Sequence, residues 1–479
     1  MRRANTCADK LLVSLTAGLL LLITGSASLA DAPTLPKGLS SDPSESGAGP
    51  SAPALPPGLV IDNEGSLTQS DRANGSDSSP AEFGGFFEAR LGFRTQDDPH
   101  QADSSVREIR IQLGLQKDWD VVSLRTVADF LFDPVAGDDR LDLENGDGAL
   151  DLREANLLYR ASTWMDVKAG RQVLTWGTGD LIFINDMFPK DWNSFFVGRD
   201  MEYLKAPSDA AKVSLYTASA NVDIAYTPRF DPDRYIDGRR ISYYHPALGE
   251  VVGRSEPIRT DDPDDWLRDD EIAARLYWNL GSFETALYGY DGYWKSPNGY
   301  DGSTGLFTFP RLTVLGASTR GPVSGGIGNA EVGHYDSRED GDGSDPQVRN
   351  SEWRVLFGYE RELAPDLTGS VQYYLEQMDD YGNYLDTLPP GSPPKDSKRH
   401  VVTLRLTRLA MNQNMMLSLF NFYSPSDEDG YLRLSGLYKM TDAVRFELGG
   451  NLFYGEEDHT FFGQFEGVSN IYAGVRTGF

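Results

Sequence analysis

The sequence predicts an all-β fold, a transmembrane antiparallel β-barrel of about 18 strands preceded by a disordered N-terminal arm. Three observations lead to this prediction. After Phe83 the chain falls into segments of about ten residues with alternating polarity, as strands between water and lipid require. The spacers between these segments alternate between short and long. Finally, Asn470 to Phe479 is an amphipathic strand that stops on a terminal aromatic residue.

Residues 1–30 have the features of a secretory signal peptide. A basic start is followed by an apolar core from Leu11 to Ile23 and by small residues, including Ala30, at a suitable cleavage site. A membrane anchor is the alternative, but the apolar run is short for a spanning helix. Cys7, the sole cysteine, precedes the apolar core, so we expect a mature protein without thiols.

Residues 31–82 are rich in Pro, Ser, Gly and Asp and hold too few apolar residues to bury a core. We expect a disordered periplasmic arm. Leu35 to Leu39 (LPKGL) and Leu55 to Leu59 (LPPGL) nearly repeat each other and suggest docking of a periplasmic partner. The alternative is a flexible tether with a chance repeat in a biased composition.

The barrel is predicted over residues 83–479, and its connections alternate in length. Short connections are expected near Asp118, Thr163, Ala220, Gly281, Gly321, Pro365, Asn412 and Thr441. Long ones are expected at 96–104, 134–149, 175–208, 230–268, 295–310, 337–347, 380–396, 424–429 and 455–467. Tight turns at one end and long loops at the other are typical of a membrane barrel, whereas a soluble sandwich or propeller does not require them.

Composition narrows the classes of function. The net charge of −28 disfavours nucleic acid, which needs clustered Lys and Arg. No apolar stretch of helix-spanning length follows the first thirty residues, so a helical membrane protein is excluded.

Charged residues alternate with apolar ones on the predicted strands, and lipid would expel them at a cost of about 2–4 kcal/mol each near the midplane. We therefore expect them to line the lumen. The basic members are Arg90, Arg94, Arg110, Arg125, Arg275, Arg354, Arg405, Arg433, Arg445 and Arg476. The acidic members are Glu88, Glu108, Asp129, Glu271, Glu352, Glu376 and Glu447. Two interpretations remain open: a basic strip that orients an anionic solute, or Arg–Glu pairs that only stiffen the wall.

The long connection at 175–208 is far too apolar to extend into solvent. We expect it to fold into the barrel and narrow the pore, although an external cap packed on its own aromatic residues is the alternative. The candidate residues of the constriction are Arg171, Gln172, Asp180, Asp186, Lys190, Asp191, Arg199 and Asp200.

Two short features support a family resemblance. Gly170-Arg171-Gln172 at a strand end, followed by Trp176-Gly177, resembles a motif of outer-membrane barrels of the alginate-export type and related porin-like channels. The terminal strand resembles the C-terminal signature strand of such barrels, which implies recognition of Phe479 by the barrel-assembly machinery. The resemblance implies the outer membrane of a Gram-negative bacterium, with lipid around the barrel. The mixed Glu and Arg lining departs from a purely basic polysaccharide conduit.

The acidic loops raise the question of metal binding. Asp340, Asp342 and Asp345 have spacing that suits calcium, but the full calcium-loop pattern is missing. The alternative is a solvated surface that binds divalent cations loosely. We expect no other cofactor.

The predicted function is passive diffusion of small hydrophilic or anionic solutes, with saccharide export or uptake as one version. None of the five histidines lies in a hydrolase motif, so we expect no enzyme. The alternative function is a barrel that sheathes a partner protein, such as an electron-conduit cytochrome.

Overall fold

The computed structural model describes residues 80–135, 146 and 148–479. These residues belong to one unit of the chain, Asp77–Phe479. The predicted signal peptide, and the predicted arm as far as residue 79, lie outside the described residues.

Eighteen antiparallel strands form one sheet in the described part of the chain, each bonded to the next in sequence order. The first nine are β1 (Glu82–Arg94), β2 (Ser104–Asp118), β3 (Val122–Phe132), β4 (Leu150–Ser162), β5 (Met165–Val173), β6 (Pro207–Tyr216), β7 (Asn221–Thr227), β11 (Glu271–Leu280) and β12 (Phe283–Tyr293). The other nine are β15 (Arg311–Val323), β16 (Gly326–Ser337), β17 (Glu352–Ala364), β18 (Leu367–Met378), β19 (Lys398–Ala410), β20 (Met415–Ser424), β21 (Asp429–Lys439), β22 (Val444–Tyr454) and β23 (Asn470–Gly478).

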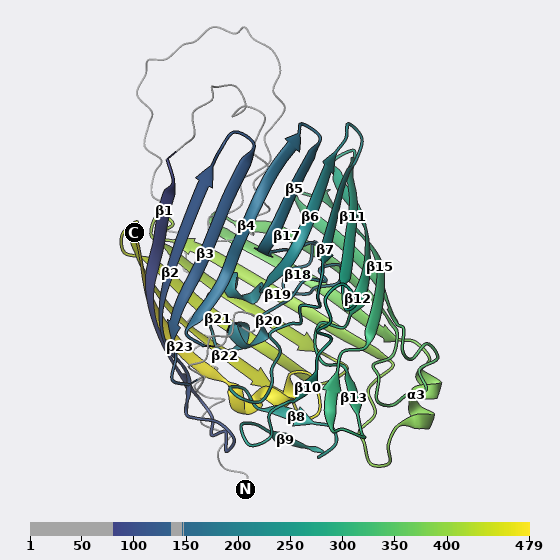
Figure 1. The fold of residues 1–479 in the computed structure, drawn as a ribbon. Helices are drawn as coiled ribbons and strands as arrows, with labels where there is room; N and C mark the ends of the chain where they lie inside the picture. Colours follow the sequence, from purple (N-terminus) through teal and green to yellow (C-terminus); the bar gives the residue numbers. More distant parts are fainter. Residues whose placement is uncertain (1–79, 136–145, 147) are drawn as a thin grey trace, which may run out of the picture. The chain divides into compact units, whose positions relative to one another are not determined.

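The first and last strands close the sheet into a barrel (Figure 1). β1 pairs with β23 from Phe86 opposite Gly478 to Arg94 opposite Asn470. Closure leaves no strand edge unpaired, which is the condition for a sheet that crosses a bilayer. The predicted fold class is confirmed.

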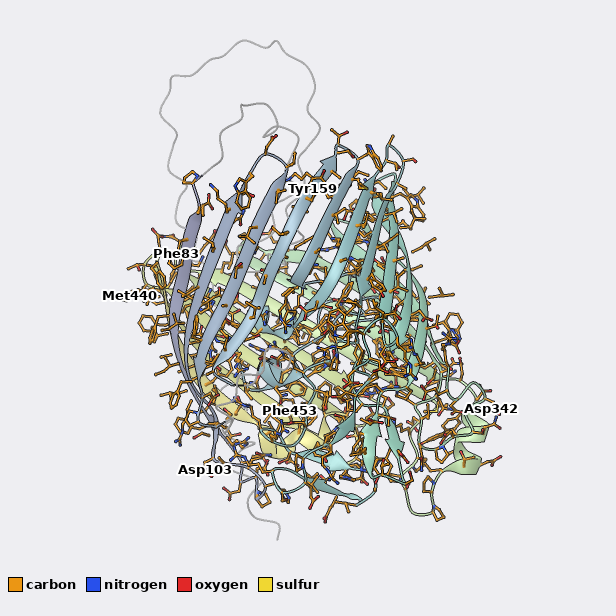
Figure 2. The ribbon with its side chains drawn as sticks, viewed as in Figure 1. Phe83, Asp103, Tyr159, Asp342, Met440 and Phe453 are labelled. Carbon is orange, nitrogen blue, oxygen red and sulfur yellow. The ribbon has the colours of Figure 1, made fainter. Side chains whose placement is uncertain are left out.

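Alternation along the strands separates two faces. On β1, Phe87, Leu91 and Phe93 are exposed, whereas Glu88 and Arg90 between them are buried inside. The same period of two gives apolar exteriors throughout, because lipid accepts these side chains and water in the lumen solvates the polar ones. Figure 2 shows Phe83, Tyr159 and Met440 toward the turn end and Asp103 and Asp342 toward the loop end.

Connections of two lengths separate the ends of the barrel. The tight turns lie where the sequence placed them, with one shift: β15 continues past Gly321 to Val323, and the turn is Ser324-Gly325. Both turn residues have positive φ, 45° for Ser324 and 80° for Gly325, as two-residue hairpin turns often require, and glycine adopts this conformation without steric cost. At the other end the connection between β20 and β21 is shorter than the other loops.

Small elements form within the long loops. They are α2 (Trp192–Phe196), η2 (Met201–Leu204), β8 (Tyr243–His245), β9 (Glu250–Val252), β10 (Thr260–Asp261), β13 (Gly299–Asp301), β14 (Leu306–Thr308), α3 (Tyr381–Thr387) and η3 (Gly463–Val468). Of these, β8, β9, β10, β13 and α3 gather at one end of the barrel (Figure 1). Among the described residues, no helix has both the length and the apolar character needed to cross a membrane.

Candidate functional site

The connection between β5 and β6, residues 174–206, folds into the barrel, and we call it the infolded loop. It contains α2, which begins after Asp191, whose carboxylate accepts from the Ser194 amide at 2.7 Å. A short polar cap of this kind satisfies a helix N-terminus that would otherwise be left without partners. Gly198, with φ of 84°, lets the chain turn after α2.

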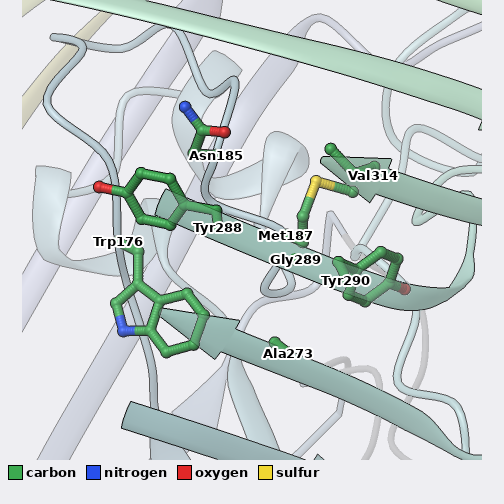
Figure 3. A pocket seen from close by; sticks show the side chains of 8 residues that line it. All are labelled: Trp176, Asn185, Met187, Ala273, Tyr288, Gly289, Tyr290 and Val314. Atoms are coloured by element: carbon green, nitrogen blue, oxygen red, sulfur yellow. The ribbon is translucent and has the colours of Figure 1, made fainter. Parts of the chain in front are cut away.

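The first half of the infolded loop packs on the wall formed by β11, β12 and β15. Trp176 meets Phe188 edge-on at 4.9 Å and lies 6.3 Å from Tyr288 on β12. A small cavity of about 10 Å³ lies between loop and wall, next to Met187 and Val314 (Figure 3). The loop therefore seats closely on the barrel instead of resting above it.

The second half of the loop packs on the opposite side, against β21 and β22. Phe196 meets Phe453 at 4.9 Å, and Phe195 meets Tyr431 at 5.5 Å. Phe465 of η3 joins the same cluster, 5.2 Å from Phe196. The infolded loop thus crosses the lumen, which supports the predicted infolding over an external cap.

Lumen side chains bind the loop backbone just after α2. Arg90 donates to the carbonyl of Gly198 at 2.5 Å. Arg433 donates to the carbonyls of Phe195 and Arg199 at 3.3 and 3.0 Å. Cations at a helix C-terminus stabilise its free carbonyls. These arginines are 2% and 5% exposed, so they hold the loop and are not open to solutes.

Glu331 on β16 accepts hydrogen bonds from N–H groups of the loop, whereas Arg90 and Arg433 donate to its carbonyls. Its carboxylate accepts from the backbone N–H groups of Thr178 and Gly179, the latter at 2.6 Å. It also accepts from the Asn185 amide at 2.9 Å. A carboxylate bonded to several donors is a strong charge-assisted contact, so the loop is fixed from this wall too.

The tip of the loop meets a charged cluster on β1, β22 and β23. Arg445, the second residue of β22, forms an ion pair with Asp200 at 2.6 Å. Arg476 on β23 contacts Glu202 at 2.7 Å, Asp200 at 3.4 Å and Glu88 at 2.6 Å. Burial disfavours the charge of Asp200, but Arg476 and Arg445 outweigh it and lower the pKa of that carboxyl.

Asp180 forms a second charged pair with Arg405 at 2.7 Å. With its amide turned to match, Gln372 bonds both backbone groups of Asp180, at 2.8 and 2.9 Å. Burial raises the pKa of Asp180 above its ordinary value, although Arg405 and Arg320 favour the charged form.

A second loop, residues 228–270, holds the infolded loop from its outer side. Asp233 accepts from the Lys190 amide at 2.8 Å and from the Trp192 indole at 3.1 Å. Arg234 forms ion pairs with Asp151 at 2.8 Å and with Asp191 at 3.4 Å. Sequence reasoning missed this second layer, because nothing in the composition of 230–268 shows which loops touch.

The predicted constriction residues separate into two groups. Asp180 and Asp200 reach the lumen and are 26% and 22% exposed as side chains. The others are buried in contacts within or beside the loop: Asp186 with Lys190, Asp191 with α2, Arg199 with Glu108, Arg171 with Asp209, and Gln172 with the Ala210 carbonyl. Sequence reasoning missed Glu202, which is 47% exposed.

The predicted lining residues all fall on the inner face by strand register. Most have partners on the same or neighbouring strands, as the stiffened-wall interpretation requires. These pairs are Arg110 with Glu108 and Asp129, Arg125 with Glu154, Arg275 with Glu284, Arg354 with Glu352, and Arg90 with Glu88. Arg90 also reaches Glu447 two strands away, and Glu376 binds Arg349 of the loop before β17. Glu271 binds Lys295, and Arg94 donates to the Arg240 carbonyl.

The proposed calcium residues do not converge. Asp340 accepts from the Ser344 amide, Asp342 from its hydroxyl, and Asp345 from the Gln347 amide. Within the described ranges, no group of three or more acidic, His or Cys side chains is arranged to hold a metal ion. The one-three spacing is used for turns inside the loop instead.

No protein-family model matches the sequence, and no curated protein matches it either. Solved structures do share the fold. OccD3 (OpdP) of Pseudomonas aeruginosa has a TM-score of 0.50 at 9% identity, over 84% of this chain and 93% of that one. OccAB4 of Acinetobacter baumannii has a TM-score of 0.50 at 8% identity, over 85% and 100%. The chain therefore has the eighteen-stranded, porin-like barrel fold; at these identities the likeness shows the fold alone.

Proposed function

We propose that the protein is an outer-membrane channel for passive diffusion of small hydrophilic or anionic solutes. The observation that carries the proposal is a closed barrel with an apolar exterior whose lumen is narrowed by a charged, internally bonded loop. An apolar exterior suits lipid, and charged side chains inside require water. Such transport is passive and non-enzymatic.

The narrowed lumen retains charged pairs that a solute can meet. Arg445 with Asp200 and Arg405 with Asp180 place opposite charges side by side at partly exposed positions. Charged rings and constrictions select solutes by charge and size. Toward the turn end, a cavity of about 300 Å³ lies beside β1 to β3 and is lined by Gln112, Gln116 and Arg125, among others.

The purified protein in a planar bilayer tests the proposal. Discrete steps of ion conductance are expected, whereas a barrel that sheathes a partner protein would be silent alone. Liposome swelling against sugars, amino acids and organic acids then ranks the solutes. A protein that inserts as a folded barrel but neither conducts nor swells liposomes would refute the channel.

Three finer proposals accompany the channel function, and the solute panel tests the first of them. The resemblance to alginate-export barrels makes anionic saccharides one arm of the solute panel. Recognition of Phe479 by the assembly machinery, and a periplasmic partner of residues 31–82, are further proposals that conductance does not address.

A further inference from the structure

We infer that Glu202 of the infolded loop sets the charge preference of the channel, and that this preference is for cations. The inference rests on the proposed function and decides between its hydrophilic and anionic versions. The first observation concerns the contacts of the arginines that would make a basic strip.

The arginines around the loop tip are occupied. Arg90, Arg433 and Arg476 are each less than a tenth exposed. Arg90 and Arg433 donate to loop carbonyls, and Arg476 faces the carboxylates of Glu88, Asp200 and Glu202. A guanidinium that is covered by protein and already paired attracts a passing anion weakly.

The charges of the same cluster balance. Three arginines, Arg90, Arg445 and Arg476, form ion pairs with four carboxylates, Glu88, Glu447, Asp200 and Glu202. Arg433 supplies the fourth positive charge, because it interacts electrostatically with Glu447 as well as with the loop carbonyls. Which charge a passing solute meets therefore depends on exposure.

Glu202 is the most exposed charge of this cluster. Its side chain is 47% exposed, against 33% for Arg445, 22% for Asp200 and 13% for Glu447. One of its oxygens binds Arg476 at 2.7 Å, so the carboxylate is held in place while half of it faces the lumen. A fixed charge in a lumen with low-dielectric walls acts more strongly on passing ions than the same charge in bulk water.

The loop end adds a field of the same sign. Asp261, Asp264 and Asp265 are exposed there, and the whole chain carries a net charge of −28. An acidic entrance concentrates cations and depletes anions before they reach Glu202.

Reversal potentials of the full-length protein in a bilayer under a KCl gradient test the inference. We expect a K⁺ to Cl⁻ permeability ratio above one. Glu202→Gln should move the ratio about twofold toward unity, because one partly screened charge changes the local potential by about a third of kT/e and the ratio responds to twice that change. Glu202→Lys should move it further in the same direction, and Arg445→Gln should raise it.

Glu284→Gln is the matched control. Glu284 is also a half-exposed carboxylate (53%) with an arginine partner, Arg275, but it lies on β12 and not on the loop. A small effect of this variant supports the inference. A conducting wild type that prefers Cl⁻, or equal shifts from Glu202→Gln and Glu284→Gln, overturns it and leaves the channel intact. Absence of conductance refutes the channel and the inference together.

Discussion

The guanidinium of Arg433 donates to the carbonyl of Phe195 at 3.3 Å and lies 5.3 Å from the centre of the same residue's ring. One wall residue thus holds both the backbone and the side chain of α2. Residues 433 and 195 are distant in sequence, and barrel closure and loop docking bring them together.

Arg433→Met should loosen the infolded loop while the barrel stays folded. The substitution leaves the carbonyls of Phe195 and Arg199 without this donor, at a cost of about 1–3 kcal/mol for hydrogen bonds to a charged group. Limited proteolysis should cut within 174–206 in the variant and spare the wild type. Equal protection of residues 174–206 in the variant and in the wild type would contradict the role of Arg433.

Deletion of residues 181–197 should raise single-channel conductance by about twofold or more, because it removes the material that crosses the lumen. It also removes the Phe195 carbonyl and the α2 ring that Arg433 contacts, and so uncovers this arginine. The selectivity of the channel that lacks residues 181–197 should therefore shift toward anions in reversal-potential measurements. An unchanged conductance would refute the constriction.

Asp233→Asn should loosen the contact between the second loop, residues 228–270, and the infolded loop, although the side chain keeps its size. Asp233 accepts from the Lys190 amide, the Trp192 indole and the Ser296 hydroxyl, and an Asn amide nitrogen cannot accept. Hydrogen exchange of residues 190–193 should increase. Asp237→Asn, in the same loop but outside these contacts, serves as the control and should leave the exchange unchanged.

As pH falls, the ion selectivity should change first through protonation of Asp180 and only later through protonation of Asp200. The pKa of Asp180 is raised by burial, so its carboxyl takes up a proton first as pH falls, and the lumen loses one negative charge. The pKa of Asp200 is lowered by Arg476 and Arg445, so its contribution to stability persists above its unfolded pKa and is lost only as pH falls through the lower folded value. Cation preference should begin to decline at a higher pH in the wild type than in Asp180→Asn, and identical titrations would contradict this assignment.

Gly85→Val should reduce the yield of closed barrels. Gly85 and Phe479 exchange backbone hydrogen bonds of 3.1 and 3.0 Å, and a Cβ at Gly85 would collide with the Gln112 carbonyl on β2. The obstacle is backbone, and backbone held in the sheet cannot move aside as a flexible side chain can. Gly84→Val, whose Cβ would meet only ordinary contacts, is the control. Heat-modifiable mobility on gels measures the folded fraction.

The barrel could be predicted from the sequence because strand pattern and turn chemistry are local. Period-two alternation and connection lengths placed the strands, and the one misplaced turn arose because Pro322 and Val323 still pair across the hairpin. Solute-facing residues depend on which side chains the loop covers. Arg90 and Arg433 stand on the inner face as expected, yet the loop buries them, and no local pattern separates them from Arg445. Glu202 follows an apolar stretch, and its exposed position beside Arg476 depends on contacts between residues distant in sequence.

The contacts of the infolded loop imply an order of assembly, in which the last strands join the sheet before the loop docks. It lies between β5 and β6, but Arg433, Asn451, Asn470 and Arg476, which bind it, come from β21 to β23, far later in the chain. The loop cannot reach its final place until those strands have joined the sheet, and Arg90 of β1 meets its Gly198 carbonyl beside the closing seam. A barrel that stalls before closure would therefore stay wide open and unobstructed, so docking of this loop is the step that separates a finished channel from a leaking one.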